Sequence, residues 1–421
     1  MVAITGPAGT GKTTILRQVH KELSNAGYKV TLCAPTGKAA RRIKEATGIE
    51  ASTIHKLLEY PRPGDRDPNT GKPLQVGFPS RSRANPIDYD IVLCDEYAMV
   101  NHEVHRNLVD ALPAGGVIRC FGDVNQLQPI ETDWRMKDKP SPFMDMLERF
   151  PSVRLTTIHR QGEGSGITEN AAYILAGRQP RKKDDFLMTF TEKPLRALEM
   201  YLRAHADPFD EQPPIMFDSL EHQIITPANK RLAGAHAINT AVQRIYRDFS
   251  MNKPIRLPRQ SWDEKAGIIC DVCLHDKIIW LDNNYDLDIM NGEQGIIEDI
   301  DHEFGGLTIN FGDRVIEIPS DMPTTNKKGE IVSYDPRMSI MLAYAVTTHK
   351  SQGSEYQHVV YILNQSAMWM HCRSNFYTGV TRARTAVNVL ADAKSLSNAV
   401  RRKESIADMK GREAAQKKGA R

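Results

Sequence analysis

Short apolar runs alternate with amphipathic stretches over the first third of the chain. Four runs rich in β-branched residues are expected to be strands, at residues 2–5, 30–34, 91–94 and 117–121. Their continuous apolar character is typical of parallel strands that are buried on both faces. Between the first two runs, Ile15, Leu16, Val19 and Leu23 recur at the spacing of one helix face. Strands alternating with helices predict a doubly wound α/β domain.

A second α/β pattern begins near Val153, includes Gln223–Thr226, and is interrupted at about Pro254. The pattern resumes with a run at Ile340–Thr347, which is expected to be a strand, and continues through residues 359–363 and 387–390. The intervening residues contain short strand-like runs joined by Asn-Gly, Gly-Gly and Gly-Asp turns, at 277–281, 294–300, 307–311 and 314–318. This part is expected to be a small β-barrel-like insertion in the second domain.

The segment Tyr60–Pro86 interrupts the first pattern. It contains six prolines, and five basic residues against two acidic ones. A segment of this composition is not a core element, and Asn69-Thr70-Gly71 is typical of a hairpin tip. Two interpretations remain open, a passive surface loop and a small inserted hairpin.

Composition narrows the class of protein further. Hydrophobic residues make up 40% and charged residues 25%, and the ends of the chain show neither a signal peptide nor a membrane-spanning run. Six scattered cysteines suit a reducing cytoplasm, and Cys270, Cys273 and His275 lack the second paired cluster that a zinc site needs. We therefore expect a cytoplasmic protein with no membrane association.

The net charge of +3 is unevenly distributed. Residues 401–421 hold eight Lys/Arg and three Asp/Glu, so the other 400 residues together carry a charge of −2. Any surface for nucleic acid must therefore be a local groove, because the body of the chain is not basic overall. The basic tail itself is expected to be peripheral.

A glycine-rich stretch after the first strand carries the clearest chemistry. Gly6-Pro-Ala-Gly-Thr-Gly11-Lys12-Thr13 has the spacing of a P-loop, and it stands between a predicted strand and a predicted helix. Glycine backbone and the helix N-terminus bind phosphates, Lys12 reaches the β- and γ-phosphates, and the Thr13 hydroxyl ligates Mg²⁺. The residues expected to bind the nucleotide are Gly6, Pro7, Ala8, Gly9, Thr10, Gly11, Lys12, Thr13 and Thr14.

Two further predicted strands end in polar residues. The run 91–94 ends in Asp95-Glu96, which places Asp95 near the Mg²⁺ of a neighbouring P-loop and lets Glu96 polarise the attacking water. A protein that only binds nucleotide has no need of the second carboxylate, so hydrolysis is favoured. The run 117–121 leads into a polar loop whose Gln126 is a candidate to contact the γ-phosphate.

The ordered series of motifs resembles a superfamily 1B helicase of the branch that contains RecD-like and phage Dda-like enzymes. Gly6–Thr13 resembles motif I, Asp95-Glu96 motif II, Gly122–Gln126 motif III and His159-Arg160-Gln161 motif IV. Motifs Ia and Ib resemble Ala34–Arg42 and Thr53–Lys56, motif V resembles Thr347–Glu355, and motif VI resembles Tyr377–Arg384. The order and approximate spacing match over about nine-tenths of the chain.

The resemblance implies roles for individual residues. Gln126 becomes the γ-phosphate sensor, and Arg160 and Arg382 become arginine fingers that stabilise charge on the transferring phosphoryl group. Gly353 and Glu355 are expected close to the nucleotide. Candidates for contacts with single-stranded DNA are Thr36, Lys38, His55, Thr348 and His349. Family members usually carry a helix upstream of motif I whose glutamine reads adenine, and only five residues precede Gly6 here, which leaves selectivity for ATP over GTP open.

The resemblance also implies a domain layout of two tandem RecA-like domains. These are domain 1A (1–59 and 87–150) with a hairpin or pin insertion 1B (60–86), domain 2A (151–254 and 340–396) with an SH3-like barrel 2B (255–339), and a basic tail (397–421). The expected activity is ATP- and Mg²⁺-dependent translocation on single-stranded DNA, 5′→3′ by resemblance, with unwinding of duplex and fork DNA by a monomer. Single-stranded-DNA-binding, replication or recombination proteins are candidate partners. Two alternatives stay open, a DNA-stimulated ATPase subunit or switch of a recombination or repair complex without unwinding, and an RNA helicase of the same superfamily.

Overall fold

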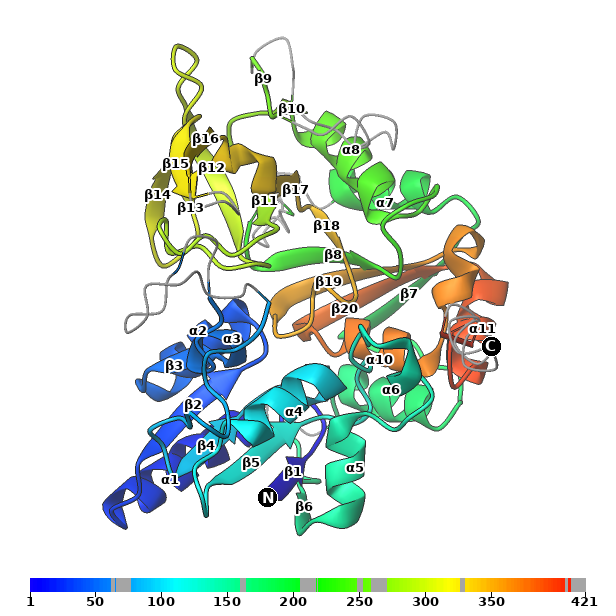
Figure 1. Ribbon diagram of the computed structural model, residues 1–421. Coiled ribbons are helices and arrows are strands. Elements are labelled where there is room, and N and C mark those ends of the chain that lie inside the picture. Colours follow the sequence, from blue (N-terminus) through cyan, green and yellow to red (C-terminus); the bar gives the residue numbers. More distant parts are fainter. Residues whose placement is uncertain are drawn as a thin grey trace, which may run out of the picture. The chain divides into compact units, whose positions relative to one another are not determined.

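The computed structural model describes residues 1–61, 65, 77–159, 164–204, 217, 219–247, 253–258, 271–325, 330–405 and 408–409. The chain divides into two compact units, the first built mainly from Met1–Arg160 and the second from Gln161–Asp321 and Asp335–Lys410. The hairpin Met322–Tyr334 groups with the first unit. Figure 1 shows the elements of each unit, and each unit is described separately below.

The first unit is a parallel six-stranded sheet in the order β3-β2-β4-β5-β1-β6. Its strands are β1 (Val2–Thr5), β2 (Val30–Ala34), β3 (Ala51–Thr53), β4 (Ile91–Cys94), β5 (Val117–Gly122) and β6 (Ser152–Arg154). Its helices are α1 (Lys12–Asn25), α2 (Gly37–Thr47), α3 (Ile54–Leu57), α4 (His102–Asp110) and α5 (Pro142–Arg149), with short turns η1 (Tyr97–Met99) and η2 (Trp134–Met136). The hairpin contributes β15 (Met322–Thr325) and β16 (Ile331–Tyr334).

Helices cover both faces of this first sheet, as the predicted doubly wound pattern requires. Alternate residues of β2 show the division, since Leu32 packs with α1 and α2 while Cys33 packs with α3, α4 and α5. Side chains also fix where helices begin, because the hydroxyl oxygens of Thr36 and Thr53 accept backbone N–H groups of α2 and α3. Helix α2 ends at Gly48, whose φ of 72° suits a residue without Cβ.

One strand belongs to a different unit than expected. Residues 152–154 were expected to open the second α/β pattern, but β6 pairs in parallel with β1 and lies at the edge of the first sheet. Its three residues are exposed. An edge strand with exposed side chains gives little periodic signal, so its partner strand could not be read from the sequence.

The second unit combines a parallel and an antiparallel sheet. The parallel sheet has the order β18-β8-β19-β20-β7, with β7 (Phe186–Phe190), β8 (His222–Thr226), β18 (Ala345–Thr347), β19 (Tyr356–Leu363) and β20 (Ala383–Ala391). The antiparallel sheet has the order β14-β13-β12-β11-β17, with β11 (Lys277–Trp280), β12 (Gln294–Ile300), β13 (Leu307–Asn310), β14 (Val315–Ile318) and β17 (Ile340–Leu342). Strands β9 (Ile255–Arg256) and β10 (Asp271–Val272) form a separate short pair.

Helices lie on both faces of the parallel sheet of the second unit. Helices α7 (Pro194–Ala204) and α8 (Ala235–Tyr246) contribute to one core, and α6 (Gly166–Leu175), α10 (Arg373–Val380) and α11 (Ala393–Arg401) contribute to the other. The remaining short turns are η3 (Pro336–Ser339) and η4 (Gln365–Met370). The pattern of alternating strands and helices therefore holds in this unit as well.

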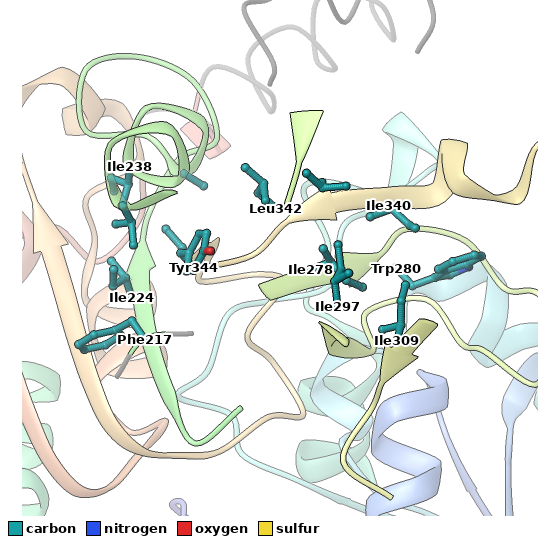
Figure 2. Close-up of a cluster of buried hydrophobic side chains, with 14 of the residues drawn as sticks. Phe217, Ile224, Ile238, Ile278, Trp280, Ile297, Ile309, Ile340, Leu342 and Tyr344 are labelled. Atoms are coloured by element: carbon teal, nitrogen blue, oxygen red, sulfur yellow. The ribbon is translucent and has the colours of Figure 1, made fainter. Parts of the chain in front are cut away.

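The two sheets of the second unit share a hydrophobic core, which Figure 2 shows. Phe217, Ile224 and Tyr344 belong to the α/β part, and Ile278 and Trp280 belong to the antiparallel part of this cluster. Buried amides reinforce the connection, because Gln294 Nε2 donates to Gln223 Oε1 at 2.9 Å. The run Ile340–Thr347, expected to be one strand, is two: β17 pairs with β11, and β18 pairs with β8. The run is apolar throughout because both strands are buried, so the break between them left no pattern in the sequence.

Candidate functional site

The predicted P-loop forms a tight turn between β1 and α1. Gly9 and Gly11 have φ angles of 82° and 77°, a left-handed conformation that favours glycine. Lys12 Nζ donates to the carbonyl oxygens of Gly6 at 2.8 Å and Pro7 at 2.9 Å, and Thr10 Oγ1 donates to the Pro7 carbonyl. The Lys12 ammonium therefore lies beside the backbone of the loop. When a nucleotide binds, it can replace its hydrogen bonds to carbonyl oxygens with hydrogen bonds to phosphate oxygens. Thr13 and Thr14 follow in the first turn of α1.

Residues 155–159 form hydrogen bonds with the end of β1 and with the loop. The Leu155 N–H donates to the Thr5 carbonyl at 2.8 Å, and the His159 N–H donates to the Gly9 carbonyl at 2.7 Å. A Cβ at Gly6 would come within 2.9 Å of Leu155 Cβ, so the close approach requires glycine. His159, expected in the second domain as part of motif IV, therefore packs within the first unit. Arg160, the first predicted arginine finger, lies outside the described residues.

Asp95 follows β4 and is nearly buried, with 8% of its surface exposed. Its Oδ1 accepts the Glu96 N–H at 2.8 Å. Burial, together with the Glu96 charge, raises the pKa of Asp95 to about 6, and the charges of Lys12 and Arg42 act in the opposite direction. Lys12 and Asp95 thus act on one another across the P-loop, as a shared phosphate and metal site requires. Sequence reasoning assigned no role to Arg42, although it lies one helical turn after Lys38 on α2.

Two buried side-chain oxygens after β4 and β5, Glu96 Oε2 and Gln126 Oε1, have no hydrogen-bond partner among the residues that the structure describes. Gln126 is 2% exposed and follows β5, which lies between β4 and β1 in the sheet. A buried polar atom left unpaired costs about 1–3 kcal/mol, and a bound polar group can supply the missing bond. The donor set of Lys12, Thr13, Asp95, Glu96 and Gln126 therefore fits a nucleoside triphosphate with its Mg²⁺.

The predicted nucleotide contacts of the second unit surround Arg382. Arg382 is 2% exposed, and its guanidinium donates to the carbonyl oxygens of Thr378 at 3.0 Å and Ser354 at 3.3 Å. Gly353, in the same turn, has a φ of 72°. The Glu355 carboxylate pairs with Arg384 at 3.0 Å. In the part of the chain that the structure describes, no carboxylate pairs with Arg382, so its positive charge is held in place without being neutralised.

The predicted DNA contacts of the first unit lie at one edge of its sheet. Thr36 and Lys38 follow β2, and His55 follows β3, which is the parallel neighbour of β2. The His55 side chain is exposed, and its ring centroid lies 4.7 Å from that of Tyr60. Partial burial of the ring lowers the pKa of His55, and the Glu103 charge raises it. These three residues therefore follow neighbouring strands, and their contact with DNA stays a prediction.

The predicted DNA contacts of the second unit are less accessible. Thr348 is fully buried, and its hydroxyl oxygen lies 3.3 Å from the Tyr361 hydroxyl and 3.5 Å from the Thr226 carbonyl. In this conformation the Thr348 side chain faces the protein interior and is not available to contact single-stranded DNA, which corrects the expectation that it does. His349 is half-buried, and burial lowers its pKa.

The segment Tyr60–Pro86 is described only in part. Arg62, Arg66 and the expected hairpin tip at residues 69–71 lie outside the described residues. Tyr60 accepts a hydrogen bond from Asn107 at 2.8 Å and packs against the core, so its ring is held by the first unit. Phe78, in contrast, is 61% exposed. Arg81 is held by Glu59 at 2.8 Å and by the Pro86 carbonyl, which anchors the end of the segment.

The loop geometry and the parallel sheets place the chain among the P-loop nucleoside triphosphatases. Residues 1–188 match the family model described as an AAA domain, and residues 342–390 match the UvrD-like helicase C-terminal domain. The ATP-dependent RecD2 DNA helicase of Deinococcus radiodurans is 28% identical over 91% of this chain and 46% of its own length. The ATP-dependent DNA helicase dda of Enterobacteria phage T4 is 33% identical over 31% of this chain and 28% of its own length.

Solved structures agree at the level of the fold. The crystal structure of Bacteroides Pif1 bound to ssDNA is 21% identical, covers 99% of this chain and 94% of its own, and has a TM-score of 0.59. The sequence relatives make the chain similar to superfamily 1B helicases of the RecD-like and Dda-like branch, and the solved structure shows a similar fold. The chain spans 46% of the length of its RecD2 relative. Among the described helices, none is long and apolar enough to cross a membrane.

Proposed function

We propose that this chain is an ATP-dependent motor that translocates on single-stranded DNA and unwinds duplex and fork DNA. The observation that carries the proposal is the pair of buried oxygens without partners, Glu96 Oε2 and Gln126 Oε1, beside the Lys12 loop. A site that only binds nucleotide needs no buried base beside the metal ligand. The relatives named above are ATP-dependent DNA helicases, and this supports the proposal that ATP hydrolysis is coupled to movement on DNA.

The residues divide the work of hydrolysis. Lys12 and the loop N–H groups bind the phosphates, and Thr13 with Asp95 would hold a Mg²⁺ that neutralises charge on the phosphate oxygens. Glu96 Oε2 accepts a proton from the attacking water. Gln126 Oε1 accepts a hydrogen bond from the same water, which lies next to the γ-phosphate. Arg160 and Arg382 stabilise the charge of the transferring group, and Gly353 and Glu355 lie near the nucleotide.

The proposed layout is that of two RecA-like domains with insertions. The antiparallel sheet β14-β13-β12-β11-β17 is proposed to be an SH3-like barrel, and residues 60–86 a hairpin that separates the strands. The boundary of the first domain is moved to follow β6, and the insertion is extended to include β17. Thr36, Lys38, His55 and His349 are proposed to contact the strand, and movement is proposed to run 5′→3′ in a monomer. Single-stranded-DNA-binding or replication proteins remain candidate partners.

ATP turnover measured with and without oligonucleotides tests the proposal. The expected result is Mg²⁺-dependent turnover that single-stranded DNA stimulates, and that Lys12→Ala abolishes because the substitution removes the phosphate-binding ammonium. Duplexes with a 5′ tail are expected to be unwound and those with a 3′ tail are not. Stimulation by RNA in place of DNA would favour the RNA-helicase alternative, and stimulated turnover without unwinding of either duplex would favour an ATPase subunit or switch.

A further inference from the structure

The second unit carries a cluster of basic side chains that the proposed mechanism does not use. We name this cluster the basic edge; it consists of Arg178, Arg181, Lys182, Arg401 and Lys403, all exposed. The first three lie in the loop between α6 and β7, and the last two lie at and after the end of α11. Strand β7 is an edge strand, at the opposite side of the sheet from β18 and the predicted strand contact at His349.

Contacts through Arg373 bring the two halves of the basic edge together. The Arg373 guanidinium donates to the carbonyl oxygens of Val400 and Arg401, at 2.7 Å and 3.4 Å. A Cβ at Gly177 would collide with the same guanidinium. Because one side chain contacts both segments, Arg178 and Arg401 lie on neighbouring parts of the surface. Figure 1 shows α6, α10 and α11 gathered on one side of the parallel sheet.

The loop of the basic edge is held in a fixed conformation. Gly177, with a φ of 73°, ends α6, and the Arg178 N–H donates to the Tyr173 carbonyl at 2.8 Å. Buried Asn170 bonds both the N–H and the carbonyl of Arg181, each at 2.7 Å. The guanidinium carbons of Arg178 and Arg181 lie 4.5 Å and 5.4 Å from the centroid of the Tyr173 ring. Two guanidiniums ordered before binding lose less entropy when an anion arrives.

Neighbouring carboxylates pair mainly with other groups, although the Arg181 charge acts on Glu169 and helps to lower its pKa. Glu169 pairs with Lys183, and Asp185 accepts hydrogen bonds from Ser165 and Gly166 at the start of α6. None of the five members of the basic edge forms an ion pair with a residue that the structure describes, although Asp184 and Glu404 are near in sequence. The cluster therefore retains its positive charge for an external anion.

The antiparallel sheet of the same unit has the opposite charge. Residues 271–321 contain thirteen Asp/Glu and two Lys/Arg. The chain as a whole carries +3, so all residues outside this segment together carry a charge of +14. A polyanion that approaches the second unit is repelled from β11–β14 and attracted to the basic edge. Arg401 and Lys403 of the basic edge belong to the basic tail at residues 397–421, whose further residues continue directly from them in sequence.

We propose that the basic edge binds the phosphate backbone of duplex DNA, separately from the single-strand contacts of the motor. The proposal rests on the proposed function for its partner. Binding of unpaired bases relies on free aromatic faces, and the Tyr173 ring is already occupied by two guanidiniums, so the cluster is suited to phosphates alone. Double-stranded DNA presents one charge per ~1.7 Å of its axis, a higher density than single strands provide.

The test compares two variants of the full chain that lose the same charge. One is Arg178→Gln/Arg181→Gln/Lys182→Gln, and its control is Lys193→Gln/Arg196→Gln/Lys253→Gln, which removes three exposed cations elsewhere in the second unit. Lys193 and Arg196 follow β7, whereas the basic edge precedes it. Affinity for a blunt-ended duplex is measured over a range of salt concentrations, and circular dichroism confirms that each variant is folded.

The basic-edge variant is expected to lower the salt slope for duplex binding by about 2.7, because each lost phosphate contact removes about 0.9. The control variant is expected to keep the wild-type slope, and both are expected to keep single-strand-stimulated ATP turnover. Equal duplex slopes for the two variants would overturn the proposal. The proposal would also be overturned, in favour of an acidic protein partner, if the basic-edge variant lost affinity for polyglutamate and bound duplex DNA as the wild type does. Absence of single-strand stimulation in the wild type would instead refute the proposed function and leave the duplex measurement intact.

Discussion

Burial of His371 makes a quantitative prediction about stability against pH. His371 is 1% exposed, and neither of its ring nitrogens has a hydrogen-bond partner in the described part of the chain. Burial lowers its pKa from 6.5 to about 4; the Asp392 charge raises the pKa and the Arg402 charge lowers it further. The folded state therefore holds the ring neutral at a pH where the unfolded chain would bind a proton.

The sign and size follow from linkage. Above pH 7 both states leave the ring neutral, and its contribution to stability is fully present. Between pH 6.5 and pH 4 the unfolded state binds more protons, so stability is lost as the pH falls. For values of 6.5 and about 4, the loss between pH 7 and pH 5 is about 2 kcal/mol.

Urea unfolding at pH 7 and pH 5 measures this contribution in His371→Leu, which removes both unpartnered nitrogens. The difference in unfolding free energy between the variant and the wild type is expected to shift by about 2 kcal/mol in favour of the variant as the pH falls to 5. His302→Gln is the control, because His302 is exposed and its replacement should leave the pH dependence of the wild type. Equal pH dependence in His371→Leu and the wild type would refute the reasoning, since it would mean that the ring is protonated in the folded state.

Three further predictions concern the motor. Glu96→Gln is expected to bind ATP but to lose turnover by at least the 10²-fold typical of a lost general base, measured as single-strand-stimulated phosphate release, and near-normal turnover would assign the base elsewhere. Arg382→Ala is expected to slow turnover by roughly 10³-fold while single-strand affinity is retained, and a parallel loss of both would indicate a structural role for its bonds to Thr378 and Ser354. A Gly/Ser linker in place of residues 65–79, which keeps Arg81 bound to Glu59, is expected to spare stimulated turnover and to reduce duplex unwinding sharply; unwinding at the wild-type rate would leave the segment as a passive loop.

Strands that are short, β-branched and bounded by polar turns were predictable almost to the residue. β2, β4 and β12 have the bounds that the apolar runs predict, although β4 alone of these three is buried along its whole length and β12 includes two exposed residues. The run at residues 340–347 was not resolved into two strands, since Ala343 and Tyr344 between them are also fully buried. The hydrophobicity of a run indicates that the strand is buried, but it does not indicate which strand it pairs with. The sheet to which each strand belongs therefore had to come from the pairing seen in the structure.

Motif resemblance predicts which residues follow a strand but not which of them are exposed. Thr36, Lys38 and His55 lie on neighbouring segments, as a shared strand contact requires, whereas Thr348 matches its motif equally well and has its hydroxyl in the interior. A motif specifies which residue types follow a strand, and the rotation of the next turn decides which of them face solvent. The basic edge had no motif at all, because its two halves are more than two hundred residues apart in sequence and are both contacted by Arg373.

The different roles proposed for the two adjacent carboxylates depend on backbone conformation, which the sequence Asp95-Glu96 does not reveal. Asp95 accepts the N–H of Glu96 and lies within the influence of Lys12 and Arg42, which suits a metal ligand. Glu96 has a φ of 51°, a left-handed conformation that costs a residue with a Cβ on the order of 1 kcal/mol. That conformation begins the turn Tyr97–Met99 and leaves Glu96 Oε2 buried without a partner. We propose that this strained backbone separates the roles of the two carboxylates, so that Asp95 would bind the metal and Glu96 would accept the proton.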